Sequence, residues 1–166
     1  MKLYLLIILL ILSAGAYGQQ TSTWAKMTPL FGEWKGEGSG EPGQGAGGFT
    51  FKLDLDGKVL VRKAHTEYAA TADKPAAHHD DLMVVYLDSG SPSKAVYFDN
   101  EGHVLNYSIT YSDKKIVFLT DKAANAPIFR LSYTLLDPDT VDVTFEMSPD
   151  GLKYMMYAEG KCKRVK

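Results

Sequence analysis

The chain has 166 residues, a net charge of −2 and a single cysteine, Cys162. This nearly balanced charge offers no strongly basic surface, so we expect neither nucleic acid nor an anionic membrane as a partner. A lone cysteine cannot form an intramolecular disulfide, so burial and hydrogen bonding alone must hold the fold together.

The first residues have the pattern of a secretory signal peptide. Lys2 precedes the apolar run Leu3–Leu12, and small residues follow up to Gly18. The run has about ten residues, whereas a membrane-spanning helix needs about 20, so we expect no stable membrane insertion. We therefore predict a signal peptide over residues 1–18 and an exported protein, periplasmic or secreted. An uncleaved anchor is the alternative, and residues 19–166 form a single domain in either case.

A glycine-rich segment, Phe31–Gly48, surrounds Trp34. Within it Gly38, Gly40 and Gly43 satisfy the spacing G-x-G-x-x-G of dinucleotide-binding loops. That motif needs a helix directly after the glycines, because free helical N–H groups must point at the phosphates. Here the chain continues into GFTFKLDLDG, whose alternation predicts a strand. The spacing is therefore not interpreted as a nucleotide site.

The same glycines suit a strand that bends at the seam of a barrel. Gly36, Gly38 and Gly40 alternate with polar residues, so one face of this strand carries no side chains. A bare face lets the strand bend and lets neighbouring groups approach the backbone closely. The later glycines, Gly43–Gly48, are expected to form a flexible connection.

After Thr28 the chain is a succession of short alternating runs separated by turn residues, without long helical periodicity. The predicted strands are Glu33–Ser39, Phe49–Asp56, Lys58–Tyr68, Asp81–Asp88, Ser93–Asp99, His103–Tyr111, Lys114–Thr120, Pro127–Leu136, Thr140–Met147 and Leu152–Arg164. The only helical candidate is Trp24–Leu30, which would close one end. The fold class is therefore all-β, an antiparallel up-and-down barrel of ten strands.

A ten-stranded barrel is wider than ordinary core side chains can fill, so we expect part of the lumen to be a cavity. Such a cavity would bind a small apolar or amphipathic ligand, with polar contacts from tyrosines and a few inward charges. Leu82, Val84 and Tyr86 share one face of their strand. The predicted ligand-binding residues are Trp34, Arg62, Tyr86, Tyr107 and Tyr111.

Three residues are weak candidates for catalysis. His65 and Glu67 project from the same face of one strand, so an inward orientation would pair a general base with an orienting acid. The pattern slightly favours a solvent-exposed face. His103 begins a strand beside tyrosines, where a hydrogen-bonded rim residue is the simpler interpretation. An enzyme, an isomerase or hydrolase using these residues, is the main alternative to a binding protein, and a purely structural envelope protein is a third possibility.

The densest polar cluster is the sequence His78-His79-Asp80-Asp81. Imidazoles and carboxylates bind zinc or copper, so His78, His79 and Asp81 are weak metal-ligand candidates. Adjacent histidines point to opposite faces of a strand, so one site could use only one of them. A solvated loop leading into a strand is the favoured interpretation.

Three stretches resemble known barrel families. The sequence Gly32-Glu33-Trp34-Lys35-Gly36-Glu37-Gly38 resembles the opening of nitrobindin-type barrels, and its Gly32-x-Trp34 core is similar to that of lipocalins and the wider calycin group. Pro75–Asp81 resembles a segment before a central nitrobindin strand. Tyr133–Thr140 and Met147–Gly151 resemble exported bacterial lipocalin-like proteins without a settled activity.

The resemblance implies a calycin-type barrel in which Trp34 closes one end beneath a basic side chain, Arg164 or Lys163. It also implies ferric haem, which nitrobindins hold through a histidine near the C-terminal end of the barrel. The last histidine here is His103, so we expect no cofactor and keep a haem or metal barrel as an alternative. Other side chains able to bind iron near that end are Tyr154, Met155, Met156, Tyr157 and Cys162.

Overall fold

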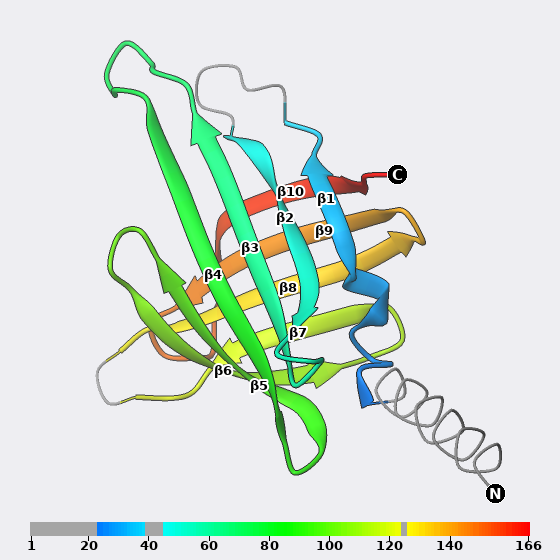
Figure 1. Ribbon diagram of the computed structural model, residues 1–166. Coiled ribbons are helices and arrows are strands. Elements are labelled where there is room, and N and C mark those ends of the chain that lie inside the picture. Colours follow the sequence, from blue (N-terminus) through cyan, green and yellow to red (C-terminus); the bar gives the residue numbers. More distant parts are fainter. Residues whose placement is uncertain (1–22, 39–44, 124–125) are drawn as a thin grey trace, which may run out of the picture.

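The computed structural model describes residues 23–38, 45–123 and 126–166. They form a closed antiparallel barrel in which each strand pairs with its neighbours in the chain and β1 pairs with β10. Figure 1 shows β1–β4 lying across β7–β10. The elements are η1 (Thr28–Leu30), β1 (Gly32–Gly36), β2 (Gly45–Asp54), β3 (Val59–Tyr68), β4 (Ala77–Asp88), β5 (Ser91–Asp99), β6 (Val104–Tyr111), β7 (Lys115–Thr120), β8 (Ile128–Asp137), β9 (Thr140–Ser148) and β10 (Met155–Arg164).

The predicted all-β barrel of ten antiparallel strands is confirmed. The predicted signal peptide lies outside the described residues. Within the described part of the chain, no helix has the length and apolar character needed to span a bilayer.

Two predicted loops are instead strand. β2 begins at Gly45 and β4 at Ala77, because the long strand β3 pairs through Tyr68 with both of these residues. The predicted flexible connection is therefore wrong over residues 45–48, and residues 43–44 lie outside the described part. Gly48 serves close approach, since a Cβ there would collide with the carbonyl oxygen of Trp34 on β1.

One end of the barrel, called the closed end below, is filled by the N-terminal segment. The side chains of Trp24, Met27, Leu30 and Trp34 are buried there. Trp34 Nε1 donates a hydrogen bond to the Leu30 carbonyl at 2.9 Å, and Trp24 Nε1 donates to the Gly57 carbonyl at 2.9 Å. The predicted helical stretch contains the short 3-10 helix η1 at its end, and this segment closes the barrel as expected.

Arg164 is the basic residue that covers Trp34. Its guanidinium lies 4.2 Å from the ring centroid and donates hydrogen bonds to the backbone carbonyls of Pro29, Phe31 and Pro138. Lys163, the other candidate, instead forms an exposed ion pair with Glu37 at 3.7 Å. The cation–π contact and the three acceptors tie the last strand to the segment before the first strand.

Aromatic side chains fill the middle of the barrel. The Tyr133 ring meets Phe49, Phe51 and Phe118 edge-to-face, with ring centroids 5.5, 5.6 and 5.8 Å apart. Phe118 continues to Tyr107 at 6.1 Å. These geometries are the ones aromatic rings prefer, and they leave the middle of the barrel well packed.

Candidate ligand-binding site at the open end

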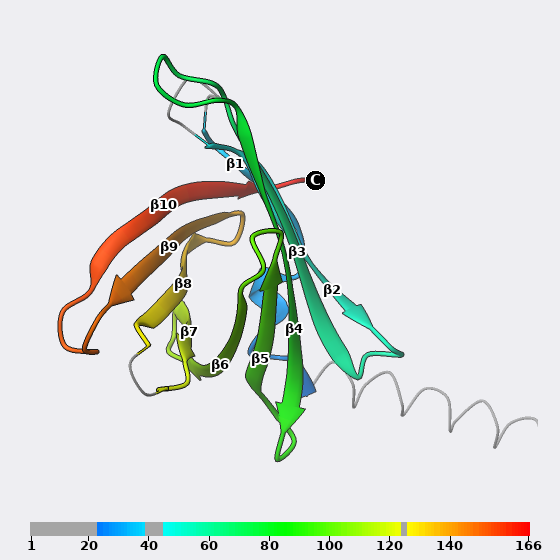
Figure 2. The same ribbon diagram turned by 90° about the vertical axis from the view of Figure 1, so that its left-hand side faces the viewer.

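The opposite end, called the open end below, is where β3 and β5 finish and β4, β8 and β10 begin. In Figure 2 the strands β8–β10 curve away from β3 and β4 toward this end. Register puts Met155 of β10 opposite Met147 and Ala158 opposite Phe145, so these side chains share the inward face. Even so, Met155 is 48% exposed. The inner face of β10 therefore meets solvent rather than a packed core.

Gly160 marks the open space directly. It pairs with Val143 on the inward face of β9, yet a Cβ built at Gly160 would meet no atom of the described residues within 4 Å. Only Trp34, Lys35 and Gly36 of β1 pair with β10, and they do so through Arg164, Lys163 and Cys162. Among the described residues, two further backbone hydrogen bonds extend that seam: Glu37 N–H donates to the Lys161 carbonyl, and Val165 N–H donates to the Glu33 carbonyl.

One wall of the open end is apolar. Phe129 and Phe145 stack with centroids 5.5 Å apart, and Tyr157 meets Phe145 edge-on at 5.7 Å. The register of β10 shifts between Met156 and Ala158, so Tyr157 is the extra residue of a bulge. The bulge turns the Tyr157 ring toward Phe145 while leaving the residue 73% exposed. Exposed aromatic surface of this kind favours contact with an apolar molecule.

The facing wall, on β4 and β5, is polar. His79 Nε2 lies 3.0 Å from the Tyr97 hydroxyl, and its Nδ1 lies 3.1 Å from Glu101. The Tyr97 hydroxyl donates to Asp99 Oδ2 at 3.3 Å, and His103 Nδ1 lies 2.9 Å from the same oxygen. Burial raises the pKa of Asp99. Hydrogen bonds from the backbone and side chain of His103 outweigh that effect, so the pKa lies below its ordinary range.

A buried ion pair lies below these walls. The Arg62 guanidinium donates a hydrogen bond to Asp81, both side chains are almost fully buried, and the guanidinium lies 5.4 Å from the Phe49 ring centroid. Burial lowers the pKa of Arg62, but nearby Tyr133 and Asp81 raise it above its ordinary value. Arg62 is therefore a permanent charge, balanced by Asp81, near the centre of the barrel.

Two polar atoms beside this ion pair have no hydrogen-bond partner among the described residues. They are Arg62 Nε and the hydroxyl oxygen of Tyr133. Burial raises the pKa of the Tyr133 hydroxyl well above its ordinary value, so this group stays protonated and can donate. A buried donor without an acceptor costs about 1–3 kcal/mol, so such donors often mark the position of a water or ligand.

The structure distributes the predicted ligand-binding residues over three regions. Arg62 and Tyr107 lie in the middle of the barrel, and Trp34 lies at the closed end. Tyr111 also lies toward the closed end, where its hydroxyl donates to the Pro92 carbonyl and Lys26 covers its ring. Tyr86 lies on the outer face of β4, because Met83 and Val85 hold the inward positions of that strand.

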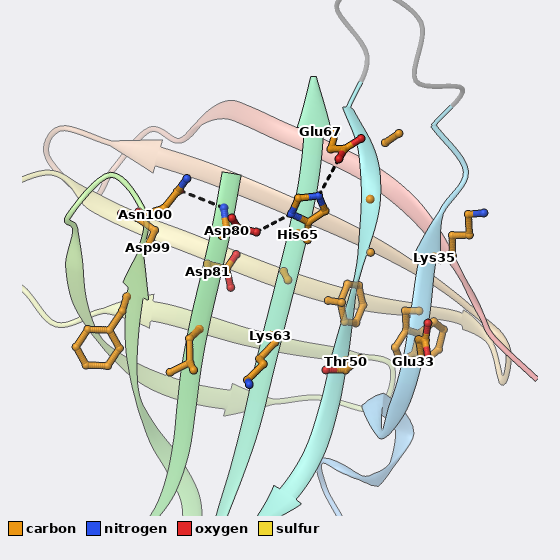
Figure 3. A pocket seen from close by; sticks show the side chains of 18 residues that line it. Glu33, Lys35, Thr50, Lys63, His65, Glu67, Asp80, Asp81, Asp99 and Asn100 are labelled. Carbon is orange, nitrogen blue, oxygen red and sulfur yellow. Dashed lines mark hydrogen bonds and ion pairs between the residues drawn. The ribbon is translucent and has the colours of Figure 1, made fainter. Parts of the chain in front are cut away.

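His65 and Glu67 lie on the outer face of β3, the orientation that the sequence slightly favoured. They line a groove of about 990 Å³ over β1–β5, in which His65 stands between Asp80 and Glu67 (Figure 3). Its Nδ1 lies 2.6 Å from Asp80 and its Nε2 lies 3.3 Å from Glu67. The hydrogen bonds to Asp80 and Glu67 raise the pKa of His65, so these contacts favour the protonated form of the imidazole.

The polar cluster from His78 to Asp81 is divided by the strand. His79 and Asp81 point inward, whereas His78 and Asp80 point outward, with His78 Nε2 3.4 Å from Asp80. Across the described ranges, no group of three or more histidine, cysteine, aspartate or glutamate side chains has an arrangement able to hold a metal ion. These residues therefore serve the polar wall and the outer groove.

His79 does not fit the axial histidine of a haem that the family resemblance implies, because both of its ring nitrogens face hydrogen-bond partners. His103 has only its Nδ1 against Asp99, which leaves Nε2 as its ring nitrogen able to bind iron. Burial raises the pKa of the inward Cys162 thiol to about 11, which disfavours the thiolate that binds iron.

Several residues of the site were not predicted as such from sequence. Tyr133 alternates with Leu131 and Leu135, a pattern from which its inward position could have been predicted, but its unpartnered hydroxyl lies beside Arg62 of a strand five positions away in the barrel. The exposure of Tyr157 depends on a bulge that has no signature in the sequence.

No family model matches the sequence, and no curated protein matches it. Among solved structures, the chain is similar to the crystal structure of Rv2717c from M. tuberculosis, with a TM-score of 0.59 and 15% sequence identity over 87% of this chain and 98% of that one. At this identity the likeness shows the fold alone. The closed antiparallel barrel of ten strands, with this neighbour, fits a calycin-like architecture.

Proposed function

We propose that this protein is an exported, lipocalin-like binding protein that holds a small amphipathic ligand at the open end of its barrel. The apolar part of the ligand packs on Phe129, Phe145 and Tyr157, and its polar part faces His79 and the Arg62–Asp81 ion pair. The apolar run near the N-terminus supports export.

The observation that carries this proposal is the open inner face of β10. Side chains on an inward barrel face are normally buried, yet Met155 remains about half exposed and no atom from the described ranges lies within 4 Å of a Cβ built at Gly160. An apolar wall and a polar wall face each other across this end, which is the arrangement that small-molecule sites use for affinity and orientation.

The test is a fluorescence titration with N-phenyl-1-naphthylamine, an apolar dye that brightens on leaving water. We expect saturable binding to the mature protein, and we expect Tyr157→Ser to weaken it about fivefold, since one aromatic contact is worth about 0.5–1.5 kcal/mol. Tyr157 is largely exposed, so this variant retains the packed core.

Phe98→Ser is the matched control. Phe98 is an exposed aromatic residue that lines the outer groove and not the open end. We expect this variant to bind the dye as the wild type does. Absence of saturable binding, or weakening by Phe98→Ser in place of Tyr157→Ser, would contradict the proposed function.

A further inference from the structure

The two unpartnered donors in the middle of the barrel belong to residues that sit close together. Both contact the Phe49 ring, whose centroid lies 5.4 Å from the Arg62 guanidinium and 5.5 Å from the Tyr133 ring centroid. Tyr133 and Arg62 also each shift the pKa of the other. Tyr133 pairs with Val143, which pairs with Gly160, so its row of inward positions ends at the open space beside β10. The donor atoms themselves are fully buried, and we call their surroundings, which this row of inward positions connects to the open end, the floor of the barrel.

The charge at this floor is already balanced. Asp81 accepts a hydrogen bond from Arg62 and lies almost fully buried beside it, so the pair is neutral overall. A carboxylate ligand would add a second buried negative charge next to Asp81, which is costly in a low-dielectric interior. A cationic ligand would face the Arg62 guanidinium, whose positive charge repels it and whose Nε–H cannot accept a hydrogen bond from it. A neutral acceptor avoids both penalties.

We infer that the floor of the barrel binds a neutral carbonyl oxygen, which accepts hydrogen bonds from Arg62 Nε–H and Tyr133 O–H. The ligand class is thus an uncharged amphiphile bearing an ester, amide or ketone group, with its chain directed along the Phe129–Phe145–Tyr157 wall. A carbonyl oxygen has two lone pairs, so one atom satisfies both donors. This inference rests on the proposed function and narrows it to one chemical class.

The experiment compares three probes of similar length as competitors of the bound dye at pH 8: methyl decanoate, the decanoate ion and undecane. The ester should displace the dye at a concentration about tenfold below that needed for either of the others, since it alone gains the two hydrogen bonds without adding charge. Each protein variant is then scored by its own ratio of ester to alkane affinity, which cancels changes in apolar packing.

Tyr133→Phe should reduce that ratio about fivefold, because it removes one donor and keeps the ring. Tyr111→Phe is the matched control, since its hydroxyl serves the Pro92 carbonyl toward the closed end, and its ratio should equal that of the wild type. Both substitutions remove a single oxygen, so both variants are expected to fold.

Decanoate as the tightest competitor would overturn the inference in favour of an anionic ligand. Equal competition by all three probes, or a ratio unaffected by Tyr133→Phe, would overturn it by assigning only a bound water to the two donors. In both cases the dye still binds and the proposed function stands. Failure of the dye to bind at all overturns the proposed function together with this inference.

Discussion

Two arginines lie over aromatic rings inside this barrel, and their hydrogen bonding differs. Arg164, at the closed end, covers Trp34 and donates to three backbone carbonyls. Arg62, in the middle, lies over Phe49 and donates to Asp81, but its Nε has no acceptor among the described residues. Arg164, whose hydrogen bonds to backbone carbonyls are all made, helps to close one end of the barrel. Arg62 keeps an N–H group without an acceptor among the described residues, and this group is available to a ligand.

Removing the ring beneath Arg164 should have the largest effect. Trp34→Ala deletes a fully buried indole, its hydrogen bond to Leu30 and the surface on which Arg164 lies. We expect the free energy of unfolding in urea to fall by about 4 kcal/mol. The outward Tyr86→Ala should cost less than about 1 kcal/mol, and equal losses for the two variants would contradict a closed end packed around Trp34.

The second largest effect is expected from removing the Arg164 guanidinium. Arg164→Ala leaves the carbonyls of Pro29, Phe31 and Pro138 without their donor, so we expect a loss of about 3 kcal/mol in the same urea measurement. Lys163→Ala is the matched control, because its ion pair with Glu37 is exposed and is worth about 0–1 kcal/mol. A cost below that of the control would show that Arg164 does not fasten this end.

At Tyr133, whose hydroxyl has no hydrogen-bond partner among the described residues, we expect a substitution to increase stability. Tyr133→Phe removes a buried hydroxyl that has no partner, so we expect the free energy of unfolding to rise by about 1 kcal/mol. Tyr111→Phe loses a hydrogen bond to Pro92 and should be destabilised by about 1 kcal/mol. If both variants lose stability equally, the Tyr133 hydroxyl is satisfied and the contrast with Arg164 disappears.

The smallest expected effect concerns the outer groove, where His65 contacts Asp80 and Glu67 but all three side chains are exposed to solvent. Hydrogen bonds to Asp80 and Glu67 raise the pKa of His65 above 6.5, so this contribution to stability is complete below 6.5 and disappears as pH rises through the raised value. Wild type should therefore exceed His65→Gln in urea stability by more at pH 5.5 than at pH 9. If wild type and His65→Gln differ in stability by the same amount at both pH values, the charge of His65 does not contribute to stability.

The strand order was predictable from sequence because turn chemistry is local. Asp56-Gly57 illustrates this, since both residues adopt positive φ angles, 52° and 74°, in the β2–β3 turn. The starts of β2 and β4 were not predictable, because the glycines and histidines there join the sheet through pairing with distant residues of neighbouring strands, above all β3. Pairing between strands is a property of the assembled barrel, and no single segment encodes it.

The candidate site was predictable only in part, for the same reason. Arg62 alternates with Leu60 and Ala64, which identified it as a possible inward charge. Its partner Asp81 was considered only as a metal ligand, because the sequence does not reveal that the two side chains meet. Likewise, the open space beside Gly160 follows from the short β1–β10 seam and from the bulge at Tyr157, both long-range features.

The most direct test of ligand binding at the open end is NMR of protein labelled with ¹³C on the methionine methyl groups, titrated with methyl decanoate. Met147 and Met155 face the open end, whereas Met27 lies in the closed end and Met156 pairs with Glu146 on the outer face. The account predicts that the Met147 and Met155 signals shift together and saturate while those of Met27 and Met156 stay in place. Shifts confined to Met27 or Met156, or no saturable shift at Met147 and Met155, would contradict it.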